Sequence, residues 1–327
     1  MEYRALGASG LKVSAVGFGG NPFGDRVDQA GADAIVGRAL DLGITFFDTA
    51  DVYPPSVPGA KGRSEEILGQ ALGKRRKEVV LATKFGMPMG PGPYEVGGSR
   101  RHVFNAVEAS LRRLGTDYID LYQMHFPDPA TPIEETLLAL ADLRQQGKIR
   151  YIGACNFRGW QVMEAAHRAK AAGVPGFVAS QNYYNLLQRH AEDERLPGAL
   201  AAGAGFIPYF PLASGLLTGK YRRGEAPPEG TRLATNSHLA YVGTWELTER
   251  NFDVVEQLEA YGREHGFTLL QLAVGWLLAQ PGVATLMAGA TKVEQLEENT
   301  AAAAVKLAPE DVAALNRIAA PQGGLPY

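Results

Sequence analysis

Four side chains with complementary chemistry follow apolar segments that are too short to be helices. Asp48 follows residues 44–47, Lys84 follows 79–83, His125 follows 118–124, and Tyr53 lies five residues beyond Asp48. A buried charge at a strand end must be paired or must face a ligand. Taken singly, Asp48 suits a helix cap, His125 a satisfied core group and Lys84 a surface side chain. Three such residues at one level of neighbouring strands predict a functional cluster.

This cluster suits proton transfer coupled to a second event. A phenol beside a buried ammonium is expected to lose its proton more readily than at its reference pKa of about 10. We therefore expect Tyr53 to be the general acid, Lys84 to tune it and Asp48 to hold Lys84. His125 is expected to donate a hydrogen bond to a substrate oxygen on which negative charge grows. The sequence has no HExxH or Cys/His ligand set, so no metal site is expected.

The elements that position these residues alternate along the chain. Eight short apolar runs, rich in β-branched and aromatic residues, are separated by amphipathic helical patterns; they cover residues 15–18, 44–47, 79–83, 118–124, 149–154, 177–180, 205–208 and 283–288. Strands that are apolar throughout are buried on both faces, as in parallel sheets. The pattern predicts a (β/α)8 TIM barrel whose catalytic face lies at the carboxyl ends of the strands.

Segments outside this alternation are expected to be additions to the barrel. Residues 3–13, with turn signals at 7–10, predict a β-hairpin that caps the barrel bottom. The long gap between the seventh and eighth runs predicts a loop over 213–247 and an extra helix near 248–265. We expect residues 1–327 to form one barrel domain. A doubly wound nucleotide fold is disfavoured because Pro22 stands where GxGxxG needs its third glycine.

Helix ends and apolar faces can also be predicted. Thr131 to Glu134 and Thr268 to Gln271 both have the pattern of a capping box, and the helix from Arg100 carries apolar residues on one face. Residues 266–291 contain no charged side chain. Two glutamines and the Pro281-Gly282 pair interrupt this run, so it predicts a buried helix followed by a buried strand rather than a membrane span.

Composition limits the partners of the chain. Its 327 residues carry 32 Lys and Arg against 35 Asp and Glu, a formal net charge of −3, which offers no field for a nucleic acid. A single cysteine, Cys155, excludes an intrachain disulfide and fits a reducing compartment. The N-terminus lacks the layout of a signal peptide, so a cytoplasmic location is expected, with no membrane partner. The oligomeric state is left open.

The chain resembles the aldo-keto reductases over nearly its whole length. The resemblance rests on the hairpin and on separated motifs in the right order: Phe46-Phe47-Asp48-Thr49-Ala50-Asp51-Val52-Tyr53, Ala82-Thr83-Lys84, Asp120-Leu121-Tyr122-Gln123-Met124-His125 and Gly147-Lys148-Ile149-Arg150-Tyr151-Ile152-Gly153. It implies a barrel that binds NADPH and reduces aldehydes or ketones by hydride transfer. The catalytic Asp, Tyr, Lys and His of that family fall on Asp48, Tyr53, Lys84 and His125.

The resemblance also implies a set of cofactor-binding residues. Asn156 and Gln181 match the pair that binds the nicotinamide carboxamide, Tyr209 matches the ring that stacks on the nicotinamide, and residues 209–220 resemble the belt over the pyrophosphate. Residues 289–291 and 295–299 resemble the segment that holds the adenosine. The full set is Gly20, Asn21, Asp48, Cys155, Asn156, Gln181, Tyr209, Pro211, Leu212, Ser214, Gly215, Lys220, Arg232, Gly289, Thr291, Gln295, Glu298 and Asn299.

Two departures from the family bear on the cofactor. Cys155 stands where many relatives have serine, and a thiol is the weaker hydrogen-bonding group. The Lys-Ser-x-x-x-Arg pattern that grips a 2′-phosphate is replaced by Gly289-Ala290 and Gln295. NADPH remains the expected cofactor because Lys220 and Lys292 supply positive charge, and NADH is an open alternative.

Substrate and activity are less closely defined. We expect a small carbonyl compound in a pocket formed by Tyr53, His125, Phe23, Phe126 and Trp245. One alternative is a sugar or polyol dehydrogenase that uses the same site in the oxidative direction. A second is a Schiff-base enzyme with Lys84 as the nucleophile. A third, from another class, is a nicotinamide-binding regulatory subunit with negligible turnover.

Overall fold

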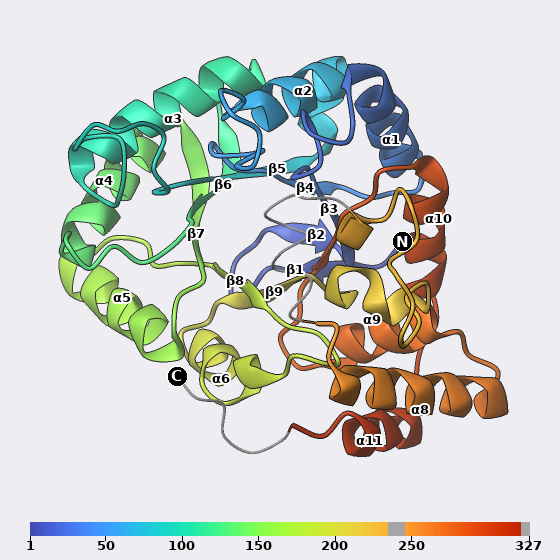
Figure 1. Cartoon of the computed structure of the whole chain (residues 1–327). Helices are drawn as coiled ribbons and strands as arrows, with labels where there is room; N and C mark the ends of the chain where they lie inside the picture. Colours follow the sequence, from blue (N-terminus) through green and yellow to red (C-terminus); the bar gives the residue numbers. More distant parts are fainter. Residues whose placement is uncertain (235–245, 322–327) are drawn as a thin grey trace.

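The barrel is closed by eight parallel strands whose spatial order follows the sequence. The computed structural model describes residues 1–234 and 246–321. Each strand pairs with the next along the chain, and the last pairs with the first (Figure 1). The strands are β3 (Val16–Gly19), β4 (Phe46–Asp48), β5 (Val80–Phe85), β6 (Ile119–Met124), β7 (Ile149–Cys155), β8 (Ala179–Tyr183), β9 (Gly205–Tyr209) and β10 (Leu286–Ala288). They fall on the eight predicted apolar runs, so the predicted (β/α)8 barrel is confirmed.

Helices form an outer ring around these strands (Figure 1). The ring consists of α1 (Gln29–Asp41), α2 (Arg63–Leu72), α3 (Arg100–Leu114), α4 (Ile133–Gln145), α5 (Gly159–Ala172), α6 (Arg195–Ala201), α9 (Leu269–Ala279) and α10 (Val293–Ala302). Outside it lie α8 (Glu249–His265) and α11 (Pro309–Ile318), and short 3-10 turns are η1 (Gly73–Glu78), η2 (His190–Glu192), η3 (Ala213–Thr218) and η4 (Arg232–Ala234). The extra helix expected near residues 248–265 is therefore present as α8.

An N-terminal hairpin closes the bottom of the barrel. Strands β1 (Tyr3–Ala5) and β2 (Lys12–Ser14) pair antiparallel. Leu6 and Val13 are fully buried in an inner core with residues from the barrel strands, including Phe46, Leu121 and Ile207. This confirms the predicted hairpin. Removal of these apolar side chains from water, at about 25 cal/mol per Å² of buried surface, is what holds the hairpin to the barrel.

Tight backbone contact at this end depends on one glycine. Gly7 has a φ of +59°, and a Cβ on it would lie 2.4 Å from the carbonyl oxygen of Gly203. The next residue, Ala8, donates its N–H to that same oxygen at 2.8 Å. Only glycine allows this approach without displacing the backbone of the neighbouring loop.

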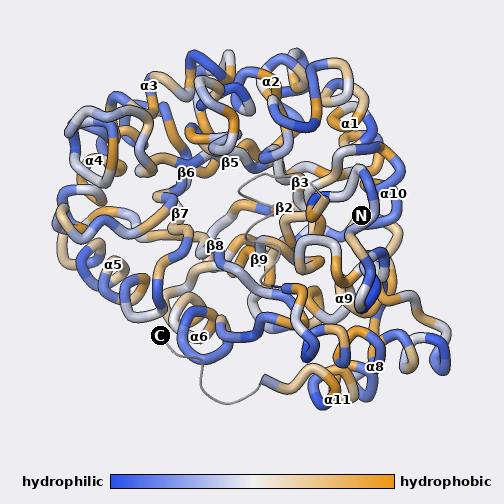
Figure 2. Tube along the Cα trace, viewed as in Figure 1, coloured by the Kyte–Doolittle hydropathy of each residue, from blue (hydrophilic) through white to orange (hydrophobic). Residues whose placement is uncertain are grey.

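A second, larger core lies between the strands and the helices. Figure 2 shows hydrophobic and hydrophilic residues interleaved along the ring helices, as expected for helices buried on one side. Helix α3 buries Val103, Val107, Leu111 and Leu114, as its periodicity predicts. Helix α9 is buried almost all round because α8 and α11 pack against it, which accounts for the uncharged run at 266–291. Within the described ranges, no helix combines the length and apolarity needed to cross a bilayer.

One predicted helix cap is confirmed and the other is wrong. At α9, the Thr268 hydroxyl accepts from the Gln271 N–H and the Gln271 side chain accepts from the Thr268 N–H, which is a complete capping box. At α4, Pro132 is the N-cap, and the Thr131 hydroxyl donates instead to Asp128 at 2.7 Å. The Asp128 carboxylate also accepts from the Gly98 N–H, so it competes successfully for Thr131 while ordering two neighbouring loops.

Candidate active site

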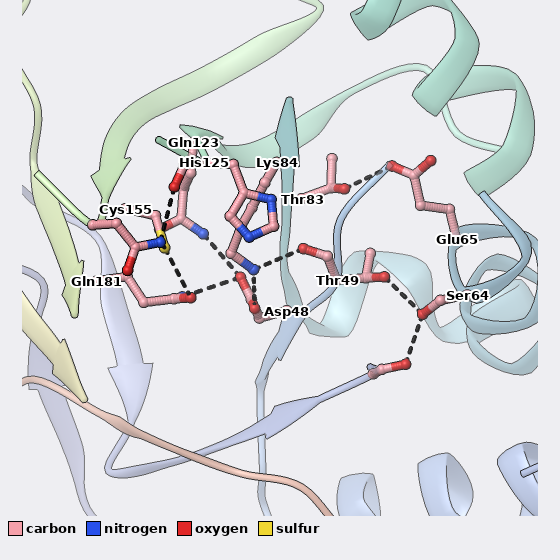
Figure 3. A network of polar contacts seen from close by, with 12 residues as sticks. Asp48, Thr49, Ser64, Glu65, Thr83, Lys84, Gln123, His125, Cys155 and Gln181 are labelled. Carbon is pink, nitrogen blue, oxygen red and sulfur yellow. Dashed lines mark hydrogen bonds and ion pairs between the residues drawn. The ribbon is translucent and has the colours of Figure 1, made fainter. Parts of the chain in front are cut away.

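The buried ammonium of Lys84 stands at the centre of the site. Its side chain is completely buried and donates to an oxygen of Asp48 and to the Thr49 carbonyl oxygen, the latter at 2.9 Å (Figure 3). Asp48 ends β4 and Lys84 lies near the end of β5, so adjacent strands deliver the two charges to one level. Burial is the largest influence and works against the ammonium, but the opposing groups, led by the Asp48 carboxylate, together raise the pKa of Lys84 above its ordinary value. Lys84 is therefore held in its charged form by Asp48.

Two amides complete the environment of the Asp48 carboxylate. Gln123, on β6, donates its side-chain N–H to Oδ1 of Asp48 at 2.8 Å, and Gln181, on β8, donates to the same oxygen at 3.3 Å (Figure 3). Each carboxylate oxygen therefore has a donor, as a buried anion requires. Gln123 was not among the predicted residues. Its signal in the sequence is a polar amide within the otherwise apolar end of β6.

Tyr53 faces both the ammonium and the imidazole. The Lys84 Nζ atom lies 5.4 Å from the centre of the Tyr53 ring, and the Tyr53 and His125 rings meet edge to face with centroids 5.7 Å apart. Burial raises the pKa of Tyr53 to about 12, although Lys84 acts in the opposite direction. The expected lowering is therefore wrong, because Asp48 neutralises the Lys84 charge and desolvation of a phenolate dominates. The phenol keeps its proton at neutral pH, as a proton donor requires.

His125 is held as a neutral ring. Burial, and secondarily the charge of Lys84, brings the pKa of His125 well below its ordinary range. Its backbone N–H donates to the Phe85 carbonyl oxygen at 2.9 Å, which fixes the residue directly after β6. Within the described residues its Nδ1 atom is buried and has no hydrogen-bond partner. A neutral imidazole has one N–H, so His125 can donate one hydrogen bond to a ligand.

The residues expected at the nicotinamide lie beside this cluster. Asn156 has a φ of +62°, donates from Nδ2 to the His125 carbonyl oxygen at 3.0 Å and accepts from the Tyr209 hydroxyl at 2.7 Å. The Tyr209 ring stacks on Tyr183 with centroids 5.6 Å apart. The Cys155 thiol lies 3.7 Å from the Gln181 side-chain oxygen, and burial raises the pKa of Cys155 to about 12. These contacts fix the direction of each polar group.

A cavity of about 740 Å³ opens from the cluster over the rim of the barrel. Its walls include most of the predicted residues: Asn21, Asp48, Tyr53, His125, Phe126, Cys155, Asn156, Gln181, Tyr209, Pro211, Leu212, Ser214, Gly215, Lys220, Arg232, Gly289, Thr291, Gln295, Glu298 and Asn299. Its size and its mixture of amides, hydroxyls and cations fit a nicotinamide dinucleotide. The buried hydroxyl of Ser214, which has no partner within the described residues, is a further donor for such a ligand.

Lys84 lies at the centre of the cluster but does not itself line the cavity, and two further predicted residues of the described part of the chain are absent from its walls. Gly20 is behind the wall, where its N–H donates to the Asp48 carbonyl oxygen and its own carbonyl oxygen accepts from Ser64. Phe23 is fully buried in the hydrophobic core, 5.3 Å from Phe18 between ring centroids, so its placement at the pocket is corrected. An aromatic residue beside a glycine-rich loop can face either way, and here core packing dominates. Trp245 lies outside the described residues.

The same cavity has walls that sequence reasoning missed. Near Asp48, Tyr53, Lys84 and His125, which we call the tetrad, these walls are Val52, Pro55 and Met87. Elsewhere in the cavity they include Arg26 and Glu229. Val52 lies within the motif at residues 46–53 but was given no role there. No motif marks the other positions, because they belong to loops whose direction is set by tertiary contacts. Their approach to the site becomes visible only in the folded chain.

The sequence model of the Aldo/keto reductase family matches residues 15–320. The chain belongs to this family. The resemblance drawn from the motifs is thereby confirmed, and the protein is an oxidoreductase of the aldo/keto reductase type. The catalytic roles of Asp48, Tyr53, Lys84 and His125 remain predictions supported by their convergence.

Individual relatives differ in their described roles. A probable voltage-gated potassium channel subunit beta from Arabidopsis thaliana is 40% identical over 91% of this chain and 90% of its own length. An L-glyceraldehyde 3-phosphate reductase from Escherichia coli O157:H7 is 37% identical over 92% and 87%. A versiconal hemiacetal acetate reductase from Aspergillus parasiticus is 34% identical over 95% of each chain. This family therefore includes both reductases and a protein named as a channel subunit.

Proposed function

We propose that this protein is an NADPH-dependent carbonyl reductase in which Tyr53 is the general acid. The single observation that carries the proposal is the placement of a protonated phenol between a buried ion pair and a neutral imidazole, at the wall of a large cavity. The bound dinucleotide supplies a hydride to the carbonyl carbon. The protein must then stabilise negative charge on the carbonyl oxygen and provide one proton.

The residues of the chain divide this task. His125 donates a hydrogen bond to the carbonyl oxygen and Tyr53 transfers its proton to that oxygen, so the C=O bond becomes CH–OH. The phenolate left on Tyr53 faces the Lys84 ammonium, and Asp48 keeps that ammonium in place. The same groups serve the reverse reaction, in which Tyr53 as phenolate accepts the proton of an alcohol. Oxidation of a sugar or polyol is the corresponding alternative direction.

The cofactor is assigned to the remaining walls of the cavity. Asn156 and Gln181 would hold the carboxamide, Tyr209 would stack on the nicotinamide, and the segment from Gln295 would hold the adenosine. We favour NADPH over NADH because Arg232 and Lys292 also line the cavity and would attract an additional phosphate. The buried free thiol of Cys155 is consistent with a cytoplasmic enzyme.

The substrate end of the cavity is apolar. Val52, Pro55, Met87 and Phe126 line it next to Tyr53, and the Phe126 ring stacks on His125 with centroids 5.3 Å apart. A carbonyl compound with an apolar or aromatic body would bury its surface on these side chains. We therefore propose uncharged aldehydes or ketones as the substrate class.

Steady oxidation of NADPH at 340 nm with a panel of nitrobenzaldehydes and aliphatic aldehydes tests the proposal. Turnover that disappears in Tyr53→Phe would support it. Cofactor binding with no turnover in either direction, over carbonyl and sugar panels, would contradict it.

The second candidate is a nicotinamide-binding regulatory subunit. The observation that favours it is the 40% identity to a protein named as a probable potassium channel subunit beta. Its expected signature is tight NADPH binding without turnover. The imine alternative is not favoured, because Asp48 keeps Lys84 charged.

A further inference from the structure

Three cations reach one region of the cavity from different parts of the chain. Arg26 comes from the loop between β3 and α1, Lys220 follows η3, and Arg232 lies in η4. Burial lowers the pKa of Arg26 and of Lys220, and Arg232 and Arg26 lower that of Lys220 further. Their positive charges are therefore close enough to repel one another. Gathering them in one cavity costs free energy unless an anion binds there.

The protein supplies little negative charge to this group. Arg26 and Lys220 form no ion pair with a carboxylate within residues 1–234 and 246–321. Segments 235–245 and 322–327 contain no Asp or Glu. Asp25 attracts Arg26 only from an exposed position, and Glu229 and Glu298 line the cavity without pairing with either cation. A bound anion would supply the negative charge that Arg26 and Lys220 lack in this part of the chain.

A neutral donor lies beside Lys220. Ser214 is 6% exposed, and its hydroxyl has no hydrogen-bond partner within the described residues. It stands in a left-handed turn with φ values of +46°, +55° and +103° at Ala213, Ser214 and Gly215. A Cβ at Gly215 would lie 2.5 Å from Cε of Lys220, so the glycine lets the lysine stem fold back over this turn. An ammonium and a hydroxyl thus border the same part of the cavity.

We propose that Arg26 and Lys220, which reach the same cavity from different segments of the chain, together bind the pyrophosphate of the dinucleotide. The inference rests on the proposed nicotinamide cofactor and adds Arg26, which no sequence motif marks. The cations line the same cavity as Tyr209, which is expected at the nicotinamide, and Gln295, which is expected at the adenosine. Lys220 ends the segment that resembles the belt over the pyrophosphate, and Arg26 is close enough to Lys220 to lower its pKa. A guanidinium presents a fork of N–H donors that matches two phosphate oxygens. Through the bound pyrophosphate, Arg26 would then connect the loop between β3 and α1 to the segment after β9.

The test replaces Arg26 and measures phosphate binding without catalysis. In Arg26→Met we expect dissociation constants for NADPH and for NADH to rise by a similar factor, about 10-fold for one charge-assisted contact. Inorganic pyrophosphate should raise the Tm of the wild type and raise that of the variant much less. Arg26→Lys should recover part of both effects, because it restores the charge without the fork.

Arg63→Met is the matched control. Arg63 packs its stem near Gly24 in the same loop region, but its guanidinium is bonded to Glu66 and it does not line the cavity. This variant should bind both nucleotides and pyrophosphate as the wild type does. Unchanged binding in Arg26→Met would overturn the proposal, as would a loss confined to NADPH, which would place Arg26 at the 2′-phosphate.

The two proposals fail in different ways. A wild-type protein that binds neither nucleotide contradicts the proposed function. In that case a Tm rise with pyrophosphate that depends on Arg26 still supports the anion site, and an equal rise in Arg26→Met overturns it. A wild type that binds NADPH, with an equally tight Arg26→Met variant, overturns the inference alone.

Discussion

The Lys84 ammonium lies 5.4 Å from the centre of the Tyr53 ring while it donates to Asp48. One charge is thus shared between a permanent partner and a phenol that becomes negative only during the reaction. The permanent partner opposes the effect of Lys84 on the resting phenol, whose pKa burial raises to about 12. The pair stabilises the phenolate when it forms without removing the proton beforehand.

Replacing Tyr53 by phenylalanine should abolish carbonyl reduction while leaving the cofactor in place. A positioned general acid contributes roughly 10²- to 10⁴-fold, so kcat/KM should fall by about that factor. The dissociation constant for NADPH, from quenching of protein fluorescence, should stay within about 2-fold, since binding depends mainly on other walls of the cavity. Wild-type turnover by the variant would contradict the role given to this phenol.

Replacing Lys84 by methionine should slow the reaction by removing the cation that faces the nascent phenolate. It also leaves the Asp48 carboxylate buried without its ammonium, so a stability loss of about 3 kcal/mol is expected. Urea denaturation measures that loss, and the double variant Asp48→Asn/Lys84→Met, which removes both charges, should recover most of it. If the double variant also recovered wild-type kcat, Lys84 would have a structural role only.

The pH dependence should differ between the two directions of the reaction. Reduction needs the protonated phenol, and with a pKa near 12 its rate should stay flat from about pH 6 to 10. Oxidation of an alcohol needs the phenolate, so its rate should rise with pH across the same range. The pKa of His125 is held well below its usual range, so the pH–rate profile should show no change near pH 6.5 from titration of that imidazole. A reduction rate that falls steeply between pH 7 and 9 would show that the phenol titrates much earlier.

Glu246 should make the protein less stable as the pH rises. Its side chain is 1% exposed, and burial raises its pKa to about 7 from 4.5. Because the folded state holds the proton more tightly, the penalty is absent below pH 4.5, grows between 4.5 and 7 and is complete above 7. Glu246→Gln should therefore raise the free energy of unfolding at pH 8 by about 3 kcal/mol and leave it unchanged near pH 4.

The matched control for that measurement is Glu264→Gln, since Glu264 is exposed in the last turn of α8, the helix that follows Glu246. Its unfolding curve should follow that of the wild type at both pH values. Equal stability of wild type and Glu246→Gln at pH 8 would mean that the Glu246 carboxylate is solvated.

Cys155 should resist alkylation in the folded protein. It is 2% exposed, and burial raises the pKa of its thiol to about 12, so almost no thiolate is present at pH 8. Iodoacetamide should therefore modify the native protein far more slowly than the protein in urea, as followed by mass spectrometry. Rapid native labelling that inactivates the enzyme would show that this wall of the cavity opens in solution.

The sequence predicts the fold well because the barrel depends on local patterns. Each strand is a short apolar run, and the spacing of apolar residues in helices such as α3 indicates which face is buried. The tetrad was predictable for a related reason: in a parallel barrel, residues that end successive strands must converge at one rim. To predict that Asp48, Lys84 and His125 converge, it was enough to predict correctly where their strands end.

Features that depend on competition between distant groups could not be predicted in this way. The pKa of Tyr53 depends on its burial and on how strongly Asp48 opposes the charge of Lys84, and the Thr131 hydroxyl donates to Asp128 instead of capping the helix. The sequence around Phe23 is compatible with a side chain in the pocket or in the core, and packing against Phe18 places it in the core. Arg26 reaches the cavity from a loop with no recognisable motif. The competitor of Thr131 is a residue of its own loop, whereas in the other cases the deciding contacts come from elsewhere in the fold.

The hairpin formed by β1 and β2 places the start of the chain on the side of the barrel away from the tetrad. A fusion partner, affinity tag or surface linker joined before Met1 would therefore project from the rear of the molecule and leave the approach of small molecules unobstructed. Deleting the same segment would expose apolar surface at the base of the strands. The amino end thus tolerates extension far better than truncation.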